Sequence, residues 1–197
     1  VTTGSPSFAG EQFTGFSVDN GAVVIGSGGL DASDTTTFDL LSRQIRVEGV
    51  VQGQRIRVVA GRNDVVYATG EVIEKAPDGS SAPSMAIDST ALGGMFANSI
   101  TITSTEDGVG VRAPRDMAAN AGGMVITADG RLVMGNASAT QNVTVETTDE
   151  ARIEGTVTGQ DVAVTTATDL VLAANAQLVA DSVALLSGGN DLTVGTN

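Results

Sequence analysis

The densest group of basic residues in this sequence is a set of five arginines within a stretch of twenty residues. Guanidinium groups bind sulfate and phosphate through paired hydrogen bonds, so the set is a candidate site for sulfated glycans or for lipid A phosphates on a target cell. Arg46 and Arg57 alternate with apolar residues and are expected to point outward on one face. The alternative is that the arginines pair with Glu48, Asp64 and their neighbours. The five residues are Arg43, Arg46, Arg55, Arg57 and Arg62.

A second charged group, mostly acidic, lies further along the chain. Two carboxylates about 5–9 Å apart can hydrolyse a glycosidic bond, so a polysaccharide-degrading enzyme is one interpretation. However, a run of charges at a turn is usually solvated, and no aromatic residue lies nearby in the sequence to stack on a sugar. We therefore expect no catalytic residue and no enzyme. The group comprises Glu146, Asp149, Glu150, Arg152 and Glu154.

The composition excludes many other functions. The chain has no Cys and no His among its 197 residues, which excludes disulfides, thiolate chemistry, zinc–thiolate sites and serine–histidine catalysis. Its 23 acidic and 10 basic residues give a net charge of −13, which repels nucleic acid and anionic membranes. No apolar run approaches the roughly 18 residues of a membrane span, and no signal peptide opens the chain. We expect neither a nucleic-acid partner nor membrane embedding.

Two glycine-containing runs resemble ligand-binding motifs only in part. The run from Ser187 to Gly195 has the order of half a calcium-binding repeat. Such sites share ligands between successive turns, and the run occurs once, so we expect no metal. The run from Gly26 to Gly29 is not followed by Lys-Ser/Thr and is not a phosphate-binding loop. The sequence therefore predicts no cofactor.

Short strands with alternating apolar residues recur along the whole chain. This period of two places one face of each strand inward. Val143, Val162 and Val183 recur at intervals of 19 and 21 residues. A repeat of about twenty residues with two or three short strands predicts a parallel β-helix in which these valines stack, with about ten coils in all. The clearest strands are Val23–Ile25, Ile45–Val47, Ile56–Val58, Ile100–Ile102, Val143–Val145, Val162–Val164, Leu170–Leu172, Val183–Leu185 and Leu192–Val194.

The first half of the chain is less regular than the second. All five Phe and the single Tyr occur at or before residue 96. Residues 74–84, and similarly Ala113–Arg115, are expected to form surface excursions, and Met117–Ala121 one helical turn. We predict that residues 1–98 form an irregular β-helical part with extra-helical elements, and that residues 99–197 form regular rod coils.

Several stretches together resemble the large exoproteins of bacterial two-partner secretion. That family includes filamentous-haemagglutinin-like adhesins and the stalks of contact-dependent growth inhibition toxins. The resemblance covers about residues 2–135, and its most specific part runs from Ala82 to Arg112. The stretches are Thr2–Pro6, Gly29–Ser33, Leu40–Arg43 with Ile45–Val47, Val58–Asn63, Ala82–Asp88, Leu92–Ala97, Thr105–Arg112 and Ala128–Leu132.

The resemblance implies a right-handed parallel β-helix that is secreted to the bacterial cell surface through an outer-membrane transporter. The sequence has no Asn-Pro dipeptide, which is typical of the early secretion domain, so we interpret the chain as the distal half of that domain plus the first rod repeats. It begins at Val1 without Met and is expected to derive from a longer protein. We expect a monomeric, non-catalytic base of a filament that presents an adhesive or toxic activity. The alternative is an adhesin that binds a receptor or glycan through the Arg43–Arg62 face.

Overall fold

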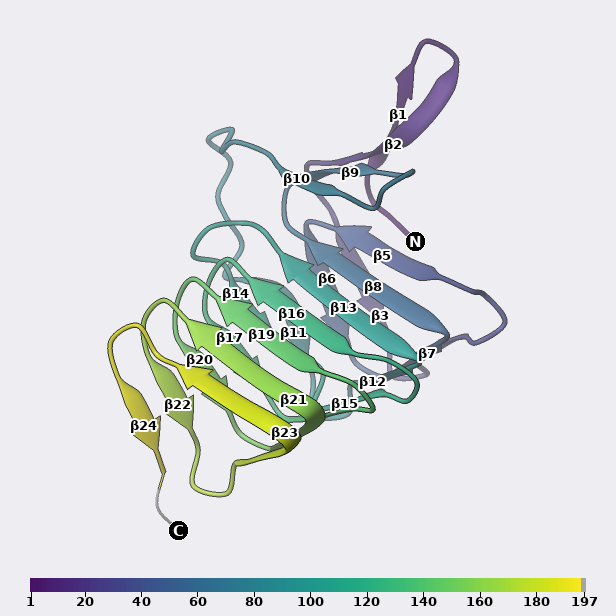
Figure 1. Ribbon diagram of the computed structural model, residues 1–197. Helices are drawn as coiled ribbons and strands as arrows, with labels where there is room; N and C mark the ends of the chain where they lie inside the picture. The colour runs from purple at the N-terminus through teal and green to yellow at the C-terminus, as the bar shows by residue number, and fades with distance from the viewer. Residues whose placement is uncertain (196–197) are drawn as a thin grey trace.

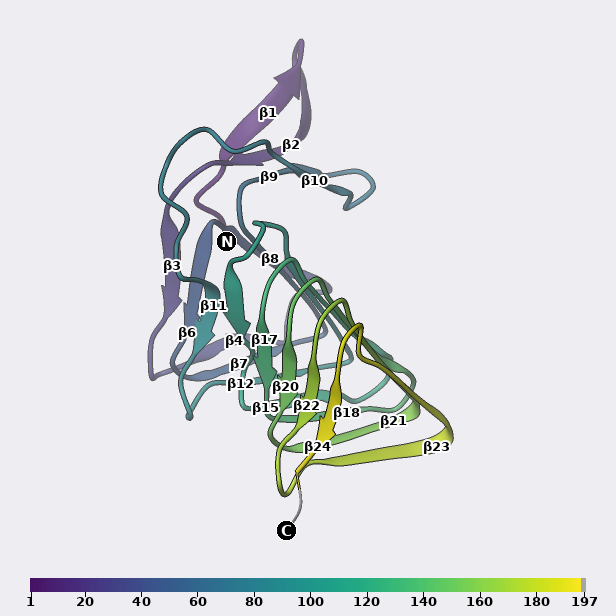
Figure 2. The same ribbon diagram turned by 90° about the vertical axis from the view of Figure 1, so that its left-hand side faces the viewer.

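The computed structural model describes residues 1–195, and the side chains of all of these except residues 183–185 and 187. Every regular element in this part of the chain is a β-strand. The chain winds as a right-handed parallel β-helix whose coils have three sides (Figure 1). Figure 2 shows these sides in successive coils. Within the described residues, no helix is long and apolar enough to cross a membrane.

The first side of the β-helix is an eight-stranded parallel sheet, with one strand from each coil. The sequence repeat predicted about ten coils, and the described residues form eight, because residues 1–21 and 61–84 form other structures. Its strands are β3 (Ala22–Ile25), β6 (Gln44–Val47), β11 (Met85–Ser89), β14 (Gly110–Arg112), β17 (Leu132–Met134), β20 (Ala151–Ile153), β22 (Leu170–Leu172) and β24 (Leu192–Val194).

The second and third sides form one twelve-stranded sheet. They join in two eleven-residue strands, β21 (Thr156–Thr166) and β23 (Gln177–Ser187), each of which runs through both sides. The other strands of the second side are β4 (Leu30–Ala32), β7 (Val50–Gly53), β12 (Gly94–Ala97), β15 (Asp116–Ala119) and β18 (Asn136–Ala139). Those of the third side are β5 (Phe38–Ser42), β8 (Arg55–Ala60), β13 (Ser99–Ser104), β16 (Met124–Ala128) and β19 (Val143–Thr147).

Aliphatic side chains fill the inside of the coils in columns. Because strand side chains alternate between faces, stacking strands in register aligns their apolar positions. One column on the third side has side chains that are at most 1% exposed. It therefore excludes water along most of the β-helix. Its members are Ile56, Ile100, Met124, Val143 and Val162.

One register prediction is wrong. Val143 pairs with Val162 as the repeat predicts, but Val162 then pairs with Ala184, and Val183 pairs with Asp161. The register shifts between Gly159 and Asp161, which admits one extra residue into the later coil. From residue 162 to 184 the repeat is thus 22 residues, one more than the valine spacing indicated. The alternation of apolar and polar residues does not show where a bulge of this kind inserts an extra residue.

Two local predictions between the first and second sides are also wrong. Met117–Ala121 does not form a helical turn, because β15 pairs with both β12 and β18 and buries Met117 and Ala119. Tertiary pairing overrides the helical propensity of this short run. Ala113–Arg115 is a tight corner with Ala113 and Pro114 buried rather than a surface excursion. The expected excursion near residues 74–84 is present, since residues 75–84 form no strand.

Extra-helical elements occur in the first half of the chain, as predicted. Four antiparallel strands form a separate sheet in the order β1-β2-β9-β10. It projects from the end of the β-helix where the chain begins (Figure 1). Val18, Leu41, Val59 and Val65 form a small second core between this sheet and the coils. The strands are β1 (Ser5–Ala9), β2 (Gln12–Val18), β9 (Asn63–Val66) and β10 (Val72–Glu74).

The strand ladders run without interruption through residue 98. On the third side, β13 pairs with β8 before it and with β16 after it. The division into residues 1–98 and 99–197 therefore stays a prediction that rests on composition.

Candidate functional site

The structure does not place the five predicted arginines on one face. Arg46 lies on β6 of the first side, whereas Arg55 and Arg57 lie on β8 of the third side. Arg43 and Arg62 follow β5 and β8, at the corner where the extra-helical sheet meets the coils. The expectation that Arg46 and Arg57 share an outward face is therefore wrong, because strand alternation cannot show to which side of a coil a strand belongs.

Arg43 is buried in a network of contacts between segments distant in sequence. Its Nε and Nη2 atoms donate hydrogen bonds to the two carboxylate oxygens of Glu106, at 3.0 and 2.5 Å. Its Nη atoms also donate to Ser80 Oγ at 3.0 Å and to the Ser81 carbonyl at 3.2 Å. The hydrogen bonds that Arg43 donates to Glu106 raise its already high pKa. This arginine thus ties β5 to loop 75–84 and to the turn after β13.

Arg62 and the single lysine, Lys75, hold the other side of the same loop. Arg62 donates to the Ala76 carbonyl at 2.7 Å and forms ion pairs with Asp19 at 3.3 Å and Asp78 at 3.0 Å. Lys75 pairs with Asp19 at 2.9 Å and with Asp64 at 3.4 Å. Its hydrogen bond is the main reason that the pKa of Asp19 lies below the usual aspartate value.

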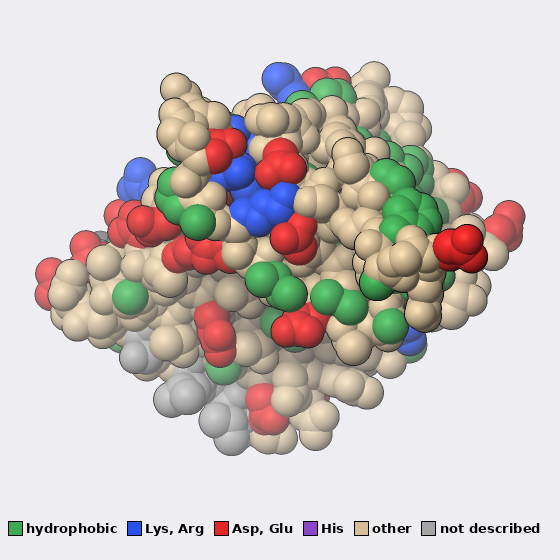
Figure 3. Space-filling view, turned by 90° about the horizontal axis from the view of Figure 1, so that it is seen from above, with side chains coloured by type: hydrophobic (Ala, Val, Ile, Leu, Met, Phe, Trp, Pro, Cys, Tyr) green, Lys and Arg blue, Asp and Glu red, His purple; other side chains and the backbone are tan. Residues whose placement is uncertain are grey.

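Arg57 fastens the hairpin of β9 and β10. It binds both carboxylate oxygens of Asp39, at 2.9 and 2.6 Å, and donates to the Gly70 carbonyl at 3.0 Å. We call Arg43, Arg57, Arg62 and Lys75 the latch, since their contacts connect the extra-helical strands and loop 75–84 to the coils. Figure 3 shows Lys and Arg side chains closely surrounded by Asp and Glu.

The two remaining predicted arginines are more exposed. Arg46 pairs with Glu48 at 2.8 Å, as the alternative interpretation predicted. Arg55 donates a long hydrogen bond, 3.4 Å, to Thr37 Oγ1 and forms no ion pair with a residue that the structure describes. Asp64 pairs with Lys75 rather than with an arginine.

Two carboxylates of the predicted acidic group form ion pairs with arginines. Glu150 pairs with Arg131 at 2.7 Å, and Glu154 pairs with Arg152 at 2.9 Å. Glu146 lies on β19 of the third side, while Arg152 lies on β20 of the first. Among the described residues, no three Asp or Glu side chains are arranged to hold a metal ion. In the run from Ser187 to Gly195, the Asp191 amide donates to Asp169 Oδ1 at 3.3 Å.

An aromatic cluster on the extra-helical sheet was not predicted from the sequence. Phe13 contacts Phe8, Phe16 and Tyr67, with ring centroids 5.9, 5.2 and 5.2 Å apart. Phe8 and Tyr67 are 59% and 66% exposed. The confinement of the aromatic residues to the first 96 positions was the signal in the sequence that could have indicated a cluster. It did not indicate that β2 and β9 pair, which is what brings the rings together.

The comparisons with known proteins agree with this architecture. Residues 1–134 match the family model of the TPS secretion domain. The chain is 40% identical over 135 residues to the tRNA nuclease CdiA-2 of Burkholderia pseudomallei, covering 68% of this chain and 4% of that protein. It is 36% identical over 161 residues to the toxin CdiA of Yersinia pestis, covering 81% and 5%. The crystal structure of the filamentous haemagglutinin secretion domain matches with a TM-score of 0.63 and 28% identity, over 98% of this chain and 58% of that one.

A projecting antiparallel sheet on a parallel β-helix, together with these matches, defines a secretion segment of a bacterial exoprotein. The chain belongs to the TPS secretion domain family of two-partner secretion exoproteins, and such exoproteins are secreted and exposed at the cell surface. The family matched is that of a secretion domain rather than of an enzyme. The nuclease and toxin names describe whole relatives, of which this chain spans about one twentieth.

Proposed function

We propose that this segment initiates folding of its exoprotein outside the cell and then forms the base of a β-helical filament. The filament presents an adhesive or toxic activity that resides elsewhere in the protein. The carrying observation is the ladder geometry, in which each strand from β13 to β19 pairs only with the coil before it and the coil after it. Such a nearest-neighbour solenoid can grow from one end as the chain emerges.

The latch supports the idea that the first coils act as a nucleus. Arg43 and Glu106 are 63 residues apart in sequence, whereas register partners in the later coils are about twenty apart. The Arg43 contact of the latch therefore closes only when residues through Glu106 have left the transporter. From that point, each new coil adds to a preformed template.

The partner that this proposal requires is the outer-membrane transporter of the two-partner secretion pathway. The match to a secretion domain supports this partner. We further propose that the folded segment is monomeric, since its net charge of −13 repels other copies.

Export of the full exoprotein tests the proposal. Val162→Pro removes a ladder hydrogen bond at a fully buried position of β21, so it should slow export and leave protein in the periplasm. Val162→Ile is the matched control, since it keeps the backbone donor. Equal export kinetics for the two variants would contradict the role of coil stacking.

Direct adhesion through the predicted arginines stays a prediction. Since Arg43, Arg57 and Arg62 are engaged in the latch, Arg46 and Arg55 are the members with exposed guanidinium groups. Comparing cell adhesion of Arg46→Ala and Arg55→Ala variants with that of the unaltered protein would test it. Unchanged adhesion would exclude this surface.

A further inference from the structure

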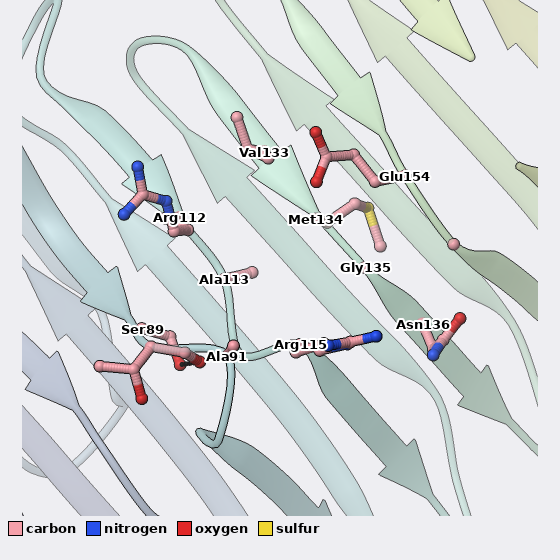
Figure 4. A pocket seen from close by; sticks show the side chains of 12 residues that line it. Ser89, Ala91, Arg112, Ala113, Arg115, Val133, Met134, Gly135, Asn136 and Glu154 are labelled. Atoms are coloured by element: carbon pink, nitrogen blue, oxygen red, sulfur yellow. Dashed lines mark hydrogen bonds between the residues drawn. The ribbon is translucent and has the colours of Figure 1, made fainter. Parts of the chain in front are cut away.

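A groove crosses the corner between the first and second sides of the β-helix, far from the latch. Its deeper part has a volume of about 600 Å³ and includes Arg112, Arg115, Asn136 and Glu154 (Figure 4). A shallower part of about 290 Å³ continues along the second side from Asn136 to Phe96. Stacked coils thus bring together residues that lie up to 69 positions apart in sequence, from Ser89 to Thr158.

Arg115 is the unusual residue of this groove. Arg112 is neutralised by Asp88 at 2.9 Å, and Glu154 by Arg152 at 2.9 Å. Within the described part of the chain, the exposed Arg115 guanidinium has no hydrogen-bond or ion-pair partner. In Figure 4 it extends toward Asn136. A free guanidinium offers paired hydrogen-bond donors to one anionic group, which is a local attraction that acts against the repulsion from the net charge of −13.

The polar groups beside Arg115 are held in place by the stacked coils. Asn136 Nδ2 donates to Asp116 Oδ1 at 2.7 Å, and Asn136 Oδ1 accepts from the Thr156 amide at 2.9 Å. Asp116 lines the shallower part of the groove, and its carboxylate can accept a hydrogen bond from a hydroxyl. Because these side chains are already ordered, binding of a ligand costs little side-chain conformational entropy.

Phe96 supplies an apolar surface at the other end of the groove. The residue is partly exposed on the second side, and its ring lies close over Gly94 of the same strand, where a Cβ would clash with it. Asp116 pairs with Gly94, and Phe96 pairs with Ala118. Ala118, the partner of Phe96, is three residues after Arg115. Arg115 and Phe96 are therefore about 10 Å apart along the strand direction. An oligosaccharide of two or more rings spans this distance.

We propose that this groove binds a uronate-containing oligosaccharide. A sugar ring stacks on Phe96, hydroxyls bind Asp116 and Asn136, and the uronate carboxylate binds Arg115. The aromatic face suits a sugar ring, and the ordered polar side chains suit its hydroxyls. The one unpaired guanidinium suits a ligand with a single negative charge per repeat. This site is distinct from the Arg43–Arg62 set and is independent of the proposed role in secretion.

Calorimetry with the full chain tests the site. The probe is a hyaluronan tetrasaccharide, which alternates glucuronate and N-acetylglucosamine, and chitotetraose is its neutral counterpart; both are titrated at about 150 mM salt to screen long-range charge effects. We expect the hyaluronan fragment to bind with a Kd of about 1 mM or tighter and chitotetraose to bind at least tenfold more weakly.

Matched variants separate the site from general electrostatics. Arg115→Ala and Phe96→Leu should each weaken binding about tenfold, whereas Arg131→Ala, which removes an exposed arginine outside the groove, should leave it unchanged. Circular dichroism checks that each variant is folded, and Phe96→Leu preserves apolar volume over Gly94. No binding of the hyaluronan fragment, equal binding of chitotetraose, or equal losses for Arg115→Ala and Arg131→Ala would each overturn the proposal.

Discussion

Arg43 and Arg131 are both paired with glutamates, but water reaches the two pairs differently. The side chains of Arg43 and Glu106 are 9% and 15% exposed, against 57% and 24% for Arg131 and Glu150. Exposed ion pairs contribute little because solvent screens them, whereas removing one partner of a buried pair leaves a desolvated charge. The same residue types therefore have different energetic weight in the latch and on the coil surface.

This difference predicts unequal effects of two matched truncations. Glu106→Ala should lower the free energy of unfolding by about 3 kcal/mol, because Arg43 stays buried without its counter-charge. Glu150→Ala should change it by less than about 1 kcal/mol. Urea unfolding followed by circular dichroism measures both, and equal losses would mean that the latch is not a buried pair in solution.

At the scale of elements, the extra-helical strands depend on the coils for their position. Loop 75–84 contains no strand and is held mainly by side chains of Arg43 and Arg62. A loop with so few backbone hydrogen bonds opens easily once its side-chain contacts are removed. The latch thus determines the conformation of this segment.

Lys75 makes this dependence measurable, because it is the only lysine in the chain. A lysine-specific protease should cleave the folded protein slowly into fragments 1–75 and 76–197, since the Lys75 side chain is only 18% exposed. Arg62→Ala should accelerate this cleavage at least about tenfold by releasing the loop, a cost of roughly 1.4 kcal/mol in opening free energy. The Arg131→Ala variant should be cleaved at the original rate. Faster cleavage of that variant as well would point to general destabilisation.

On the scale of the whole molecule, stability is distributed unevenly along the axis. One end carries the extra-helical sheet, its small core and the latch, whereas the later coils, as far as the structure describes them, are held by the coils next to them. In the end coil of the segment 1–197 taken by itself, Leu192 and Val194 are 50% and 62% exposed. In a nearest-neighbour solenoid, such an end coil opens before the interior.

Hydrogen exchange should therefore show a gradient along the first side. In the isolated segment 1–197, amides of β22 should exchange at least about tenfold faster than those of β14, because opening from the β24 end requires fewer coils to separate. Mass spectrometry of peptic fragments resolves the two strands. Uniform protection would show that the β-helix unfolds as one cooperative unit.

Sequence patterns alone were sufficient for the fold class and for much of the core. Alternating apolar residues repeated at about twenty positions admit few structures other than a stacked coil, and Val143 and Val162 do stack. Periodicity does not record insertions, so the extra residue near Asp161 and the true partner of Val162 were missed. The family resemblance followed from motifs over about residues 2–135, most specifically from Ala82 to Arg112, and was confirmed by the match to the secretion domain.

The sequence by itself determined the features that depend on residue types and on neighbours along the chain. These are the strand positions, the inward faces, the absence of His and Cys chemistry, and the family. Only the tertiary structure decided which charges meet. Arg43 reaches Glu106, and Arg115 is left unpaired beside Asn136, because winding three sides per coil places residues tens of positions apart at the same corner. Side-chain pairing across coils depends on register and corner geometry, which no local pattern of residue types encodes.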